Sequence, residues 1–195
     1  MNRIPTLTPA VPFNKDEFPR STKIRGVKLE FVRFDPDRPV EAYGQDHVPD
    51  GQKVYQWETR VIILTAEQAQ ELANQHLRVK KHDDGTFSMN LKRKTLNSKG
   101  QQNQPVRVVD CGNPATKQPP QDFKEVNTIG NGTIANLSVY QFHYVTNGGG
   151  ISEVLSAVQI VDLVPYSNSG TSDFGAEEGF SQGVVEETND DEIDF

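Results

Sequence analysis

The charges of this 195-residue chain are segregated along the sequence, and this segregation limits which part can fold. All 20 lysines and arginines lie at or before Lys124, whereas 12 of the 27 acidic residues follow it. The segment from Asp173 to Phe195 carries nine acids and few apolar residues, so burial cannot offset the conformational entropy lost on folding. We therefore expect residues 167–195 to form a disordered acidic tail, with the folded domain upstream.

Hydrophobic periodicity predicts a mainly β domain over residues 22–166, preceded by an irregular N-terminal arm over the proline-rich residues 1–21. The predicted strands cover residues 22–34, 53–64, 87–94, 106–110, 133–145 and 151–164. Thr65, with Gln68 three positions later, is typical of a helix N-terminus, and Ala69, Leu72, Ala73 and His76 would share one helix face. The sequence predicts an OB-fold-like Greek-key barrel of five to six strands with one helix; a β-sandwich is the alternative.

Several classes of protein are disfavoured by the composition. No apolar run approaches the roughly 18 residues of a transmembrane helix, and residues 1–12 lack a signal peptide's apolar core, so we expect a soluble intracellular protein. The single cysteine, Cys111, excludes an internal disulfide, and the four histidines lack metal-ligand spacing. A G-x-G-x-x-A pattern at residues 130–135 precedes a strand instead of a helix. We expect no catalytic residue, metal or cofactor.

Aromatic residues gather on one face of the strand predicted over residues 133–145. Tyr140, Phe142 and Tyr144 are two residues apart and so share a face, opposite Leu137 and Val139. Such rings are either core residues, since large aromatics are usually at least partly buried, or an exposed platform. The alternation alone leaves both interpretations open.

Basic residues lie on neighbouring predicted strands. Residues 78–99 contain seven cations and two acids, and Lys92 and Lys94 lie on the face opposite the apolar residues of their strand. Cations that follow phosphates and rings that stack on bases are what a single-stranded nucleic acid requires. The candidate DNA-binding residues are Lys53, Tyr55, Trp57, Lys92, Arg93, Lys94, Tyr140, Phe142 and Tyr144. Trp57 belongs either to this platform or to the core, and the alternative functions are a non-catalytic protein-interaction module and an RNA-binding OB-fold protein.

The acidic tail ends in an aromatic residue, which solubility alone does not require. Phe195 places a ring beside the chain's last carboxylate, an arrangement that a partner protein can capture in an apolar pocket next to a cation. The candidate partner-binding residues are Asp190, Asp191, Glu192, Asp194 and Phe195.

Several segments together resemble a known family. They are Ile129-Gly130-Asn131-Gly132, residues 148–163, Asp84-Gly85-Thr86, Val108-Val109-Asp110 and the terminal Asp194-Phe195. In order and spacing they resemble the replication single-stranded-DNA-binding proteins of phage T7 and its relatives. The resemblance implies an OB fold that binds single-stranded DNA without sequence preference, in the cytoplasm of the infected bacterial host.

The same resemblance implies roles for particular residues. The family's stacking tyrosine falls on Tyr144, a DNA-contacting lysine falls on Lys92, and Lys53 stands near the position of a family arginine. The family's tail contacts replication proteins (polymerase and helicase-primase), competes with DNA for the basic groove and supports a homodimer. These are expectations for the present chain.

Overall fold

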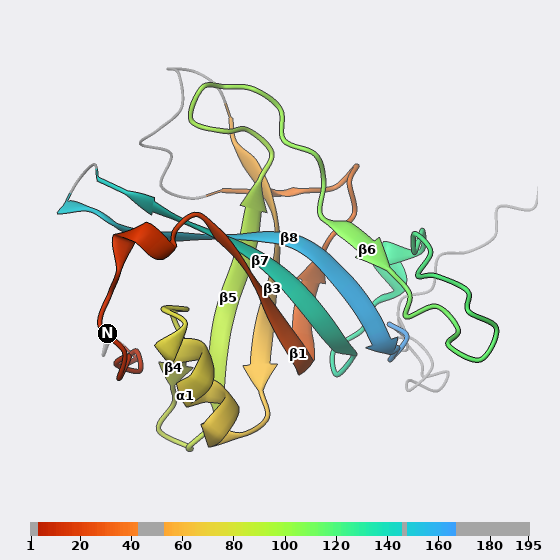
Figure 1. Ribbon diagram of the computed structural model, residues 1–195. Helices are drawn as coiled ribbons and strands as arrows, with labels where there is room; N and C mark the ends of the chain where they lie inside the picture. Colours follow the sequence, from red (N-terminus) through yellow and green to blue (C-terminus); the bar gives the residue numbers. More distant parts are fainter. Residues whose placement is uncertain (1–3, 43–52, 146–147, 167–195) are drawn as a thin grey trace, which may run out of the picture.

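Eight strands form one mixed sheet in the computed structural model, which describes residues 4–42, 53–145 and 148–166. The strands are β1 (Arg20–Arg33), β2 (Val40–Glu41), β3 (Tyr55–Ile63), β4 (Lys80–Lys81), β5 (Phe87–Lys94), β6 (Arg107–Val109), β7 (Ile134–Tyr144) and β8 (Gly150–Asp162) (Figure 1). Their hydrogen-bonded order is β4-β5-β3-β1-β7-β8-β6, with β2 paired to β3. Only the β6–β8 pair among these described strands is parallel.

The predicted mainly β, OB-like architecture with one helix is confirmed, with two differences. Over the described residues the hydrogen-bonded path does not close into a barrel, because β4 and β6 are its two ends. There are also eight strands instead of five to six, since β2 and β4 were missed. Each of these has two residues and exists by pairing with a longer neighbour, so neither is long enough to show a period in the sequence.

Strand β1 pairs with β7 along one edge and with β3 along the other, and it carries a bulge. Its first half pairs with β7 and its second half with β3, and the β1–β7 register shifts between Ile24 and Val27. Gly26 lies in this shift at a φ of +61°, which a residue with a Cβ rarely adopts, and its N–H donates to Oδ1 of Asn136 at 3.0 Å. In the sheet, β3 and β5 lie on one side of β1, and β7 and β8 lie on the other.

The helix α1 (Ala66–Asn74) begins as predicted and ends earlier than expected. The hydroxyl of Thr65 accepts a hydrogen bond from the Gln68 N–H at 3.1 Å, which satisfies a free donor of the first turn. Ala69, Leu72 and Ala73 are buried. His76 does not share this helix face, because the helix stops at Asn74 and His76 has a φ of +58° in the following turn.

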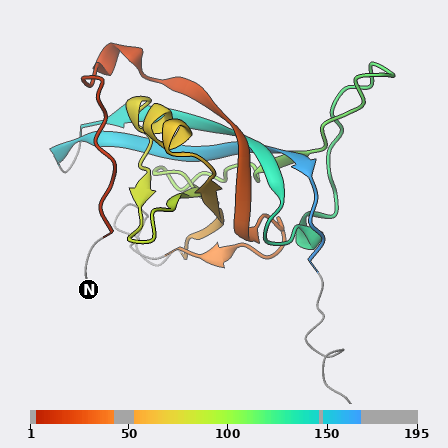
Figure 2. The ribbon, with the colours of Figure 1, turned by 90° about the horizontal axis from the view of Figure 1, so that it is seen from below.

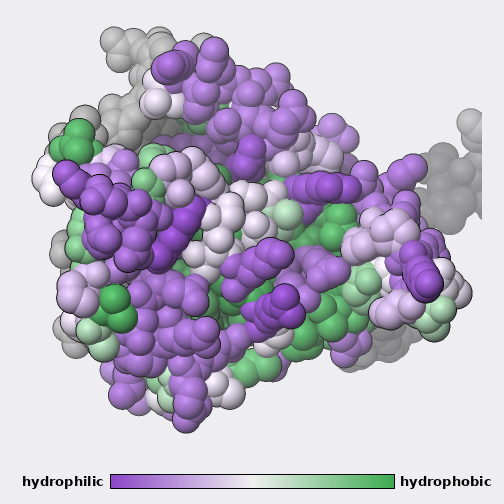
Figure 3. All heavy atoms as spheres, viewed as in Figure 1, coloured by the Kyte–Doolittle hydropathy of each residue, from purple (hydrophilic) through white to green (hydrophobic). Residues whose placement is uncertain are grey.

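The core lies within the curve of the sheet, and α1 covers one end of it beside β4 (Figures 1 and 2). Its largest fully buried apolar side chains are Ile24, Leu29, Phe34, Met89, Leu91 and Leu155. Hydrophilic side chains cover most of the face seen in Figure 3, with smaller hydrophobic areas between them. No helix in the described part of the chain is both long and apolar enough to cross a membrane.

Two short 3-10 turns complete the described elements. These are η1 (Lys15–Glu17), before β1, and η2 (Val126–Thr128), before β7. Figure 1 shows η1 beside the end of the β7–β8 pair that carries the aromatic residues. This position brings the N-terminal segment next to the candidate site.

Candidate nucleic-acid interface

The aromatic residues of β7 lie on the outward face of the strand. Ala135, Leu137, Val139 and Gln141 are buried, whereas Tyr140 and Tyr144 keep 40% and 38% of their surface exposed. Phe142, between them on the same face, is half-buried, and its ring centroid lies 6.0 Å from that of Tyr140. Tyr140 and Tyr144 are therefore exposed and are not core residues, and Phe142 lies partly covered between them.

A buried polar network fixes the position of β7 behind these rings. Oε1 of Gln141 accepts hydrogen bonds from the Thr22 hydroxyl at 2.6 Å and from Nε of Arg20 at 3.2 Å. Nε2 of Gln141 donates to the carbonyl oxygen of Gln75, just after α1, at 3.0 Å. A shift of one residue in the pairing register of β7 would bury the rings and expose this network. The network therefore holds the aromatic face outward.

The tyrosine nearest the β7–β8 turn lies across a glycine. Tyr144 pairs with Gly150 in the antiparallel ladder. A Cβ atom at Gly150 would come within 2.8 Å of the Tyr144 hydroxyl oxygen and 3.1 Å of the ring carbon that carries it. Only a residue without a side chain leaves room for the ring in this orientation.

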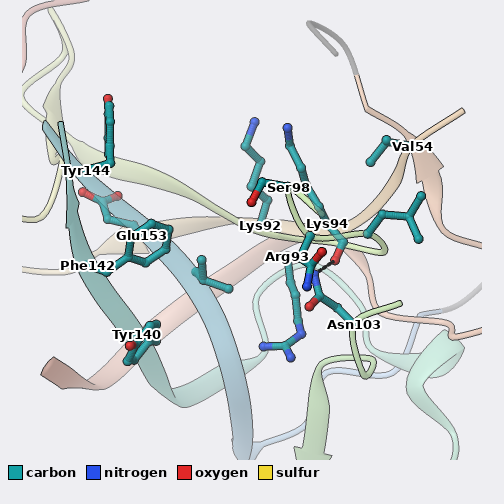
Figure 4. A pocket seen from close by; sticks show the side chains of 13 residues that line it. Val54, Lys92, Arg93, Lys94, Ser98, Asn103, Tyr140, Phe142, Tyr144 and Glu153 are labelled. Atoms are coloured by element: carbon teal, nitrogen blue, oxygen red, sulfur yellow. Dashed lines mark hydrogen bonds between the residues drawn. The ribbon is translucent and has the colours of Figure 1, made fainter. Parts of the chain in front are cut away.

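Three cations of β5 line the same groove as the aromatic residues of β7. Figure 4 shows Lys92 and Lys94 extending to one side of β5 and Arg93 to the other, as the alternation of a strand requires. Nε of Arg93 donates to the carbonyl oxygen of Gln104 at 2.6 Å. Among the described residues none of these three cations forms an ion pair, so their charges are available to a ligand.

The groove has a volume of about 940 Å³ and joins the two groups of side chains (Figure 4). Its lining residues are Val54, Lys92, Arg93, Lys94, Leu96, Asn97, Ser98, Asn103, Tyr140, Phe142, Tyr144, Glu153 and Val154. Six of the nine residues predicted from the sequence to bind DNA are thus brought together around one space. Rings on one wall and cations on the other can contact the bases and the phosphates of the same strand.

Part of this lining comes from the loop after β5, which the sequence analysis missed. Nδ2 of Asn103 donates to the carbonyl oxygen of Lys94 at 2.9 Å, and its N–H donates to that of Thr95 at 2.7 Å. These bonds fold the loop back so that Leu96, Asn97 and Ser98 line the groove. A loop has no hydrophobic period, so the sequence carried no signal for this contribution.

Glu153 is a second lining residue that sequence reasoning missed. Its carboxylate is almost fully buried, and Oε1 accepts from the backbone N–H of Arg78 at 2.8 Å and from its Nε at 3.4 Å. Burial raises the pKa of Glu153 above its ordinary value, and the nearby Arg78 opposes this effect. The sequence held a signal, because Glu153 lies on the same face of its strand as the buried Leu155.

The three remaining candidates, all in or before β3, lie outside the groove. Trp57 is 3% exposed in the core, and its Nε1–H donates to the carbonyl oxygen of Asp35 at 3.0 Å, so the prediction that it faces DNA is wrong. Tyr55 keeps 36% exposure, and Nζ of the exposed Lys53 lies 4.0 Å from a carboxylate oxygen of Glu41. Neither Lys53 nor Tyr55 is among the described residues that line the groove.

Solved structures of phage single-stranded-DNA-binding proteins are similar to this chain. One is gp2.5 of bacteriophage T7, with a TM-score of 0.48 and 14% identity over 85% of this chain and 100% of that chain. Another is the protein of bacteriophage Enc34, with a TM-score of 0.47 and 12% identity over 84% of this chain and 94% of that chain. A C-terminal truncation of the Enc34 protein has a TM-score of 0.46 and 12% identity over 75% of this chain and 88% of that chain. No protein-family model and no curated protein sequence matches the chain.

The sequence motifs resemble phage single-stranded-DNA-binding proteins, and the solved structures named above are of proteins of that class.

The candidate partner-binding residues Asp190, Asp191, Glu192, Asp194 and Phe195 lie outside the described residues. Within the described residues, no group of three or more His, Cys, Asp or Glu side chains is placed to hold a metal ion.

Proposed function

We propose that this chain binds single-stranded DNA without sequence preference, in the groove between β5 and β7. The observation that carries the proposal is that one groove joins three outward aromatic residues to three cations without ion pairs in the described chain. The rings stack on bases of any identity, and the cations neutralise the phosphates. The protein catalyses nothing and protects the strand during replication or recombination in the host cytoplasm.

Each wall of the groove has a separate role in this binding. Tyr140, Phe142 and Tyr144 supply stacking, worth about 1 to 3 kcal/mol per base and little affected by salt. Lys92, Lys94 and Arg93 supply an electrostatic contribution that weakens as salt rises, because each phosphate contact releases a bound counterion. The two contributions are therefore separable by measuring affinity as a function of salt.

We further propose that the acidic segment 167–195 competes with DNA for the groove and recruits replication proteins such as a polymerase or a helicase-primase. Support comes from the charge segregation, since the chain up to Lys124 is net basic and the segment beyond it holds 12 acids and no cation. Phe195 would be the residue that a partner captures. The same segment would support a homodimer.

The test is fluorescence anisotropy of a labelled oligo-dT, titrated with the intact protein and with a chain ending at Ser172, each at low and moderate salt. We expect salt-sensitive binding by both chains, and tighter binding by the shortened chain at low salt, where charge competition is least screened. An RNA oligonucleotide of matched length serves as a competitor, because only RNA offers the 2′-hydroxyl.

The outcomes separate the claims. An absence of binding by either chain would overturn the DNA-binding proposal and leave the aromatic wall as a protein interface. Tighter binding of the RNA competitor would assign the groove to RNA. Weaker DNA binding by the shortened chain would overturn the competition proposal and leave the groove proposal standing.

A further inference from the structure

A second hollow adjoins the groove on the other side of the aromatic residues. It has a volume of about 680 Å³ and is lined by Lys15, Asp16, Phe18, Pro19, Tyr140, Phe142 and His143. Tyr140 and Phe142 line both spaces, so the groove and this hollow meet at these two rings. The pairing of β1 with β7 ends at Arg20 and Gln141, which leaves the last three residues of β7 beside the N-terminal segment.

Phe18, which the N-terminal segment contributes to this hollow, is held in place by its neighbours. The guanidinium carbon of Arg20 lies 4.6 Å from the centroid of the Phe18 ring. Arg20 is itself fixed, because Nη1 donates to a Glu17 carboxylate oxygen at 2.9 Å and Nη2 donates to the carbonyl oxygen of Gln75 at 2.5 Å. Phe18 is half-buried, and the ring of Phe13 lies 5.6 Å from it between centroids. A ring fixed in this way stacks on a base at little entropic cost.

A cation, Lys15, lines the same hollow as Phe18. Lys15 is exposed on η1 and forms no ion pair with any described residue. Asp16 lines the same hollow, and its backbone N–H donates to Oδ1 of Asn14 at 3.1 Å. A carboxylate repels phosphate, so a nucleic-acid backbone in this hollow would lie on the side of Lys15.

We propose that this second hollow binds the nucleotide next to those in the groove, so that one DNA strand crosses Tyr140 and Phe142 and continues onto the N-terminal segment. The proposal rests on the proposed function and extends it. Phe18 stacks on the additional base and Lys15 neutralises its phosphate. The N-terminal segment, for which the sequence predicted only an irregular arm, thereby lengthens the stretch of strand that one molecule covers.

The experiment measures affinity for an oligo-dT series spanning the roughly 4 to 16 nucleotides that single OB folds cover. Lys15→Glu tests the cation, and Phe18→Leu tests stacking while it keeps an apolar side chain in the half-buried position. Lys124→Glu is the matched control, because Lys124 is exposed, undergoes the same charge change and lines neither space. Tyr144→Ala, which alters the groove alone, is measured in parallel.

The shortest oligonucleotides fit in the groove alone. On these we expect Lys15→Glu and Phe18→Leu to bind with the affinity of the wild type. On the longest oligonucleotides Phe18→Leu should bind about fivefold more weakly, which corresponds to one weak stacking contact. Lys15→Glu should lose more affinity there than Lys124→Glu.

Equal losses of affinity for Lys15→Glu and Lys124→Glu at every oligonucleotide length, with the affinity of Phe18→Leu unchanged, would overturn the proposal that the second hollow binds DNA. If Tyr144→Ala still weakened binding in that case, the groove proposal would stand. An absence of oligo-dT binding by the wild type at every length would overturn both. Because Lys15 is exposed, its replacement tests the hollow even if Phe18→Leu fails to fold.

Discussion

Two strands of this sheet carry aromatic residues spaced two apart, and only one of them presents its rings to the groove. In β7, Tyr140 and Tyr144 are exposed. In β3, which lies between β1 and β5, Trp57 is buried and its indole N–H donates a hydrogen bond to the backbone carbonyl oxygen of Asp35. The same spacing thus leaves rings exposed in one strand and places a residue in the core in the other.

The difference shows that a period of two fixes which residues share a face, and the rest of the strand decides which face is covered. Trp57 shares its face with Val61 and Ile63, which are buried. The β7 rings lie opposite Leu137 and Val139, which are buried. Phase with these aliphatic residues therefore accompanies burial of Trp57 in the middle of β3, whereas Tyr55, in the same phase at the strand's first position, keeps 36% exposure.

The largest expected effect separates the two strands by stability. Trp57→Ala should reduce the free energy of unfolding by about 3 to 5 kcal/mol, because it leaves a cavity in the core. Tyr144→Ala should change it by less than about 1 kcal/mol, since the ring is partly exposed. Urea unfolding of both variants measures the difference. A Trp57→Ala chain as stable as the wild type would contradict the core role of Trp57.

The second effect concerns DNA affinity. Tyr144→Ala should lose about 1 to 3 kcal/mol of binding to oligo-dT, with an unchanged dependence on salt, because stacking releases no counterions. Tyr166→Ala is the control, since Tyr166 is 63% exposed and does not line the groove. Equal affinities for the Tyr144→Ala chain and the wild type would remove the stacking role of β7.

The third effect concerns the opposite wall. Lys92→Ala should reduce the slope of log affinity against log salt by about 0.7, the value for one phosphate contact to a single strand. Lys124→Ala, at an exposed position outside the groove, should leave the slope unchanged. The slope is measured by anisotropy titrations at four or more salt concentrations, and identical slopes for Lys92→Ala and the wild type would place the phosphates elsewhere.

The smallest effect tests the buried carboxylate at the aromatic end of the β7–β8 pair. Because the folded-state pKa of Glu153 is raised, its protonated form favours folding below the ordinary value of 4.5, and this contribution is lost as pH rises through the folded-state pKa. The stability of the wild type relative to Glu153→Gln should therefore fall as pH rises above about 4.5. Chemical unfolding across this range measures it, and a constant difference would contradict the raised pKa.

Much of the fold could be predicted because the long strands carry their own signals. The alternation in β5 and β7 and the Thr65 cap correspond to the elements observed. The strands β2 and β4 could not be predicted, since two residues show no period and the pairing depends on a neighbour. Whether the sheet closes into a barrel depends on which strands pair in three dimensions, and no local sequence pattern determines that pairing.

The site was predictable on its strands and unpredictable in its loops. Lys92, Lys94 and the β7 rings follow from alternation on strands with a clear apolar face. Asn103 and Phe18 reach the groove and the second hollow through backbone bonds and a cation–π contact that tertiary structure creates. The sequence left Trp57 open between the DNA-binding face and the core, and its burial decides for the core.

The most direct test is ultraviolet cross-linking of oligo-dT to the intact protein, followed by mass spectrometry of the cross-linked peptides. We expect thymidine adducts on the segment from Tyr140 to Tyr144, and none on Trp57, whose ring is buried in the core. Adducts on Tyr55 or Trp57, with none between Tyr140 and Tyr144, would contradict this expectation.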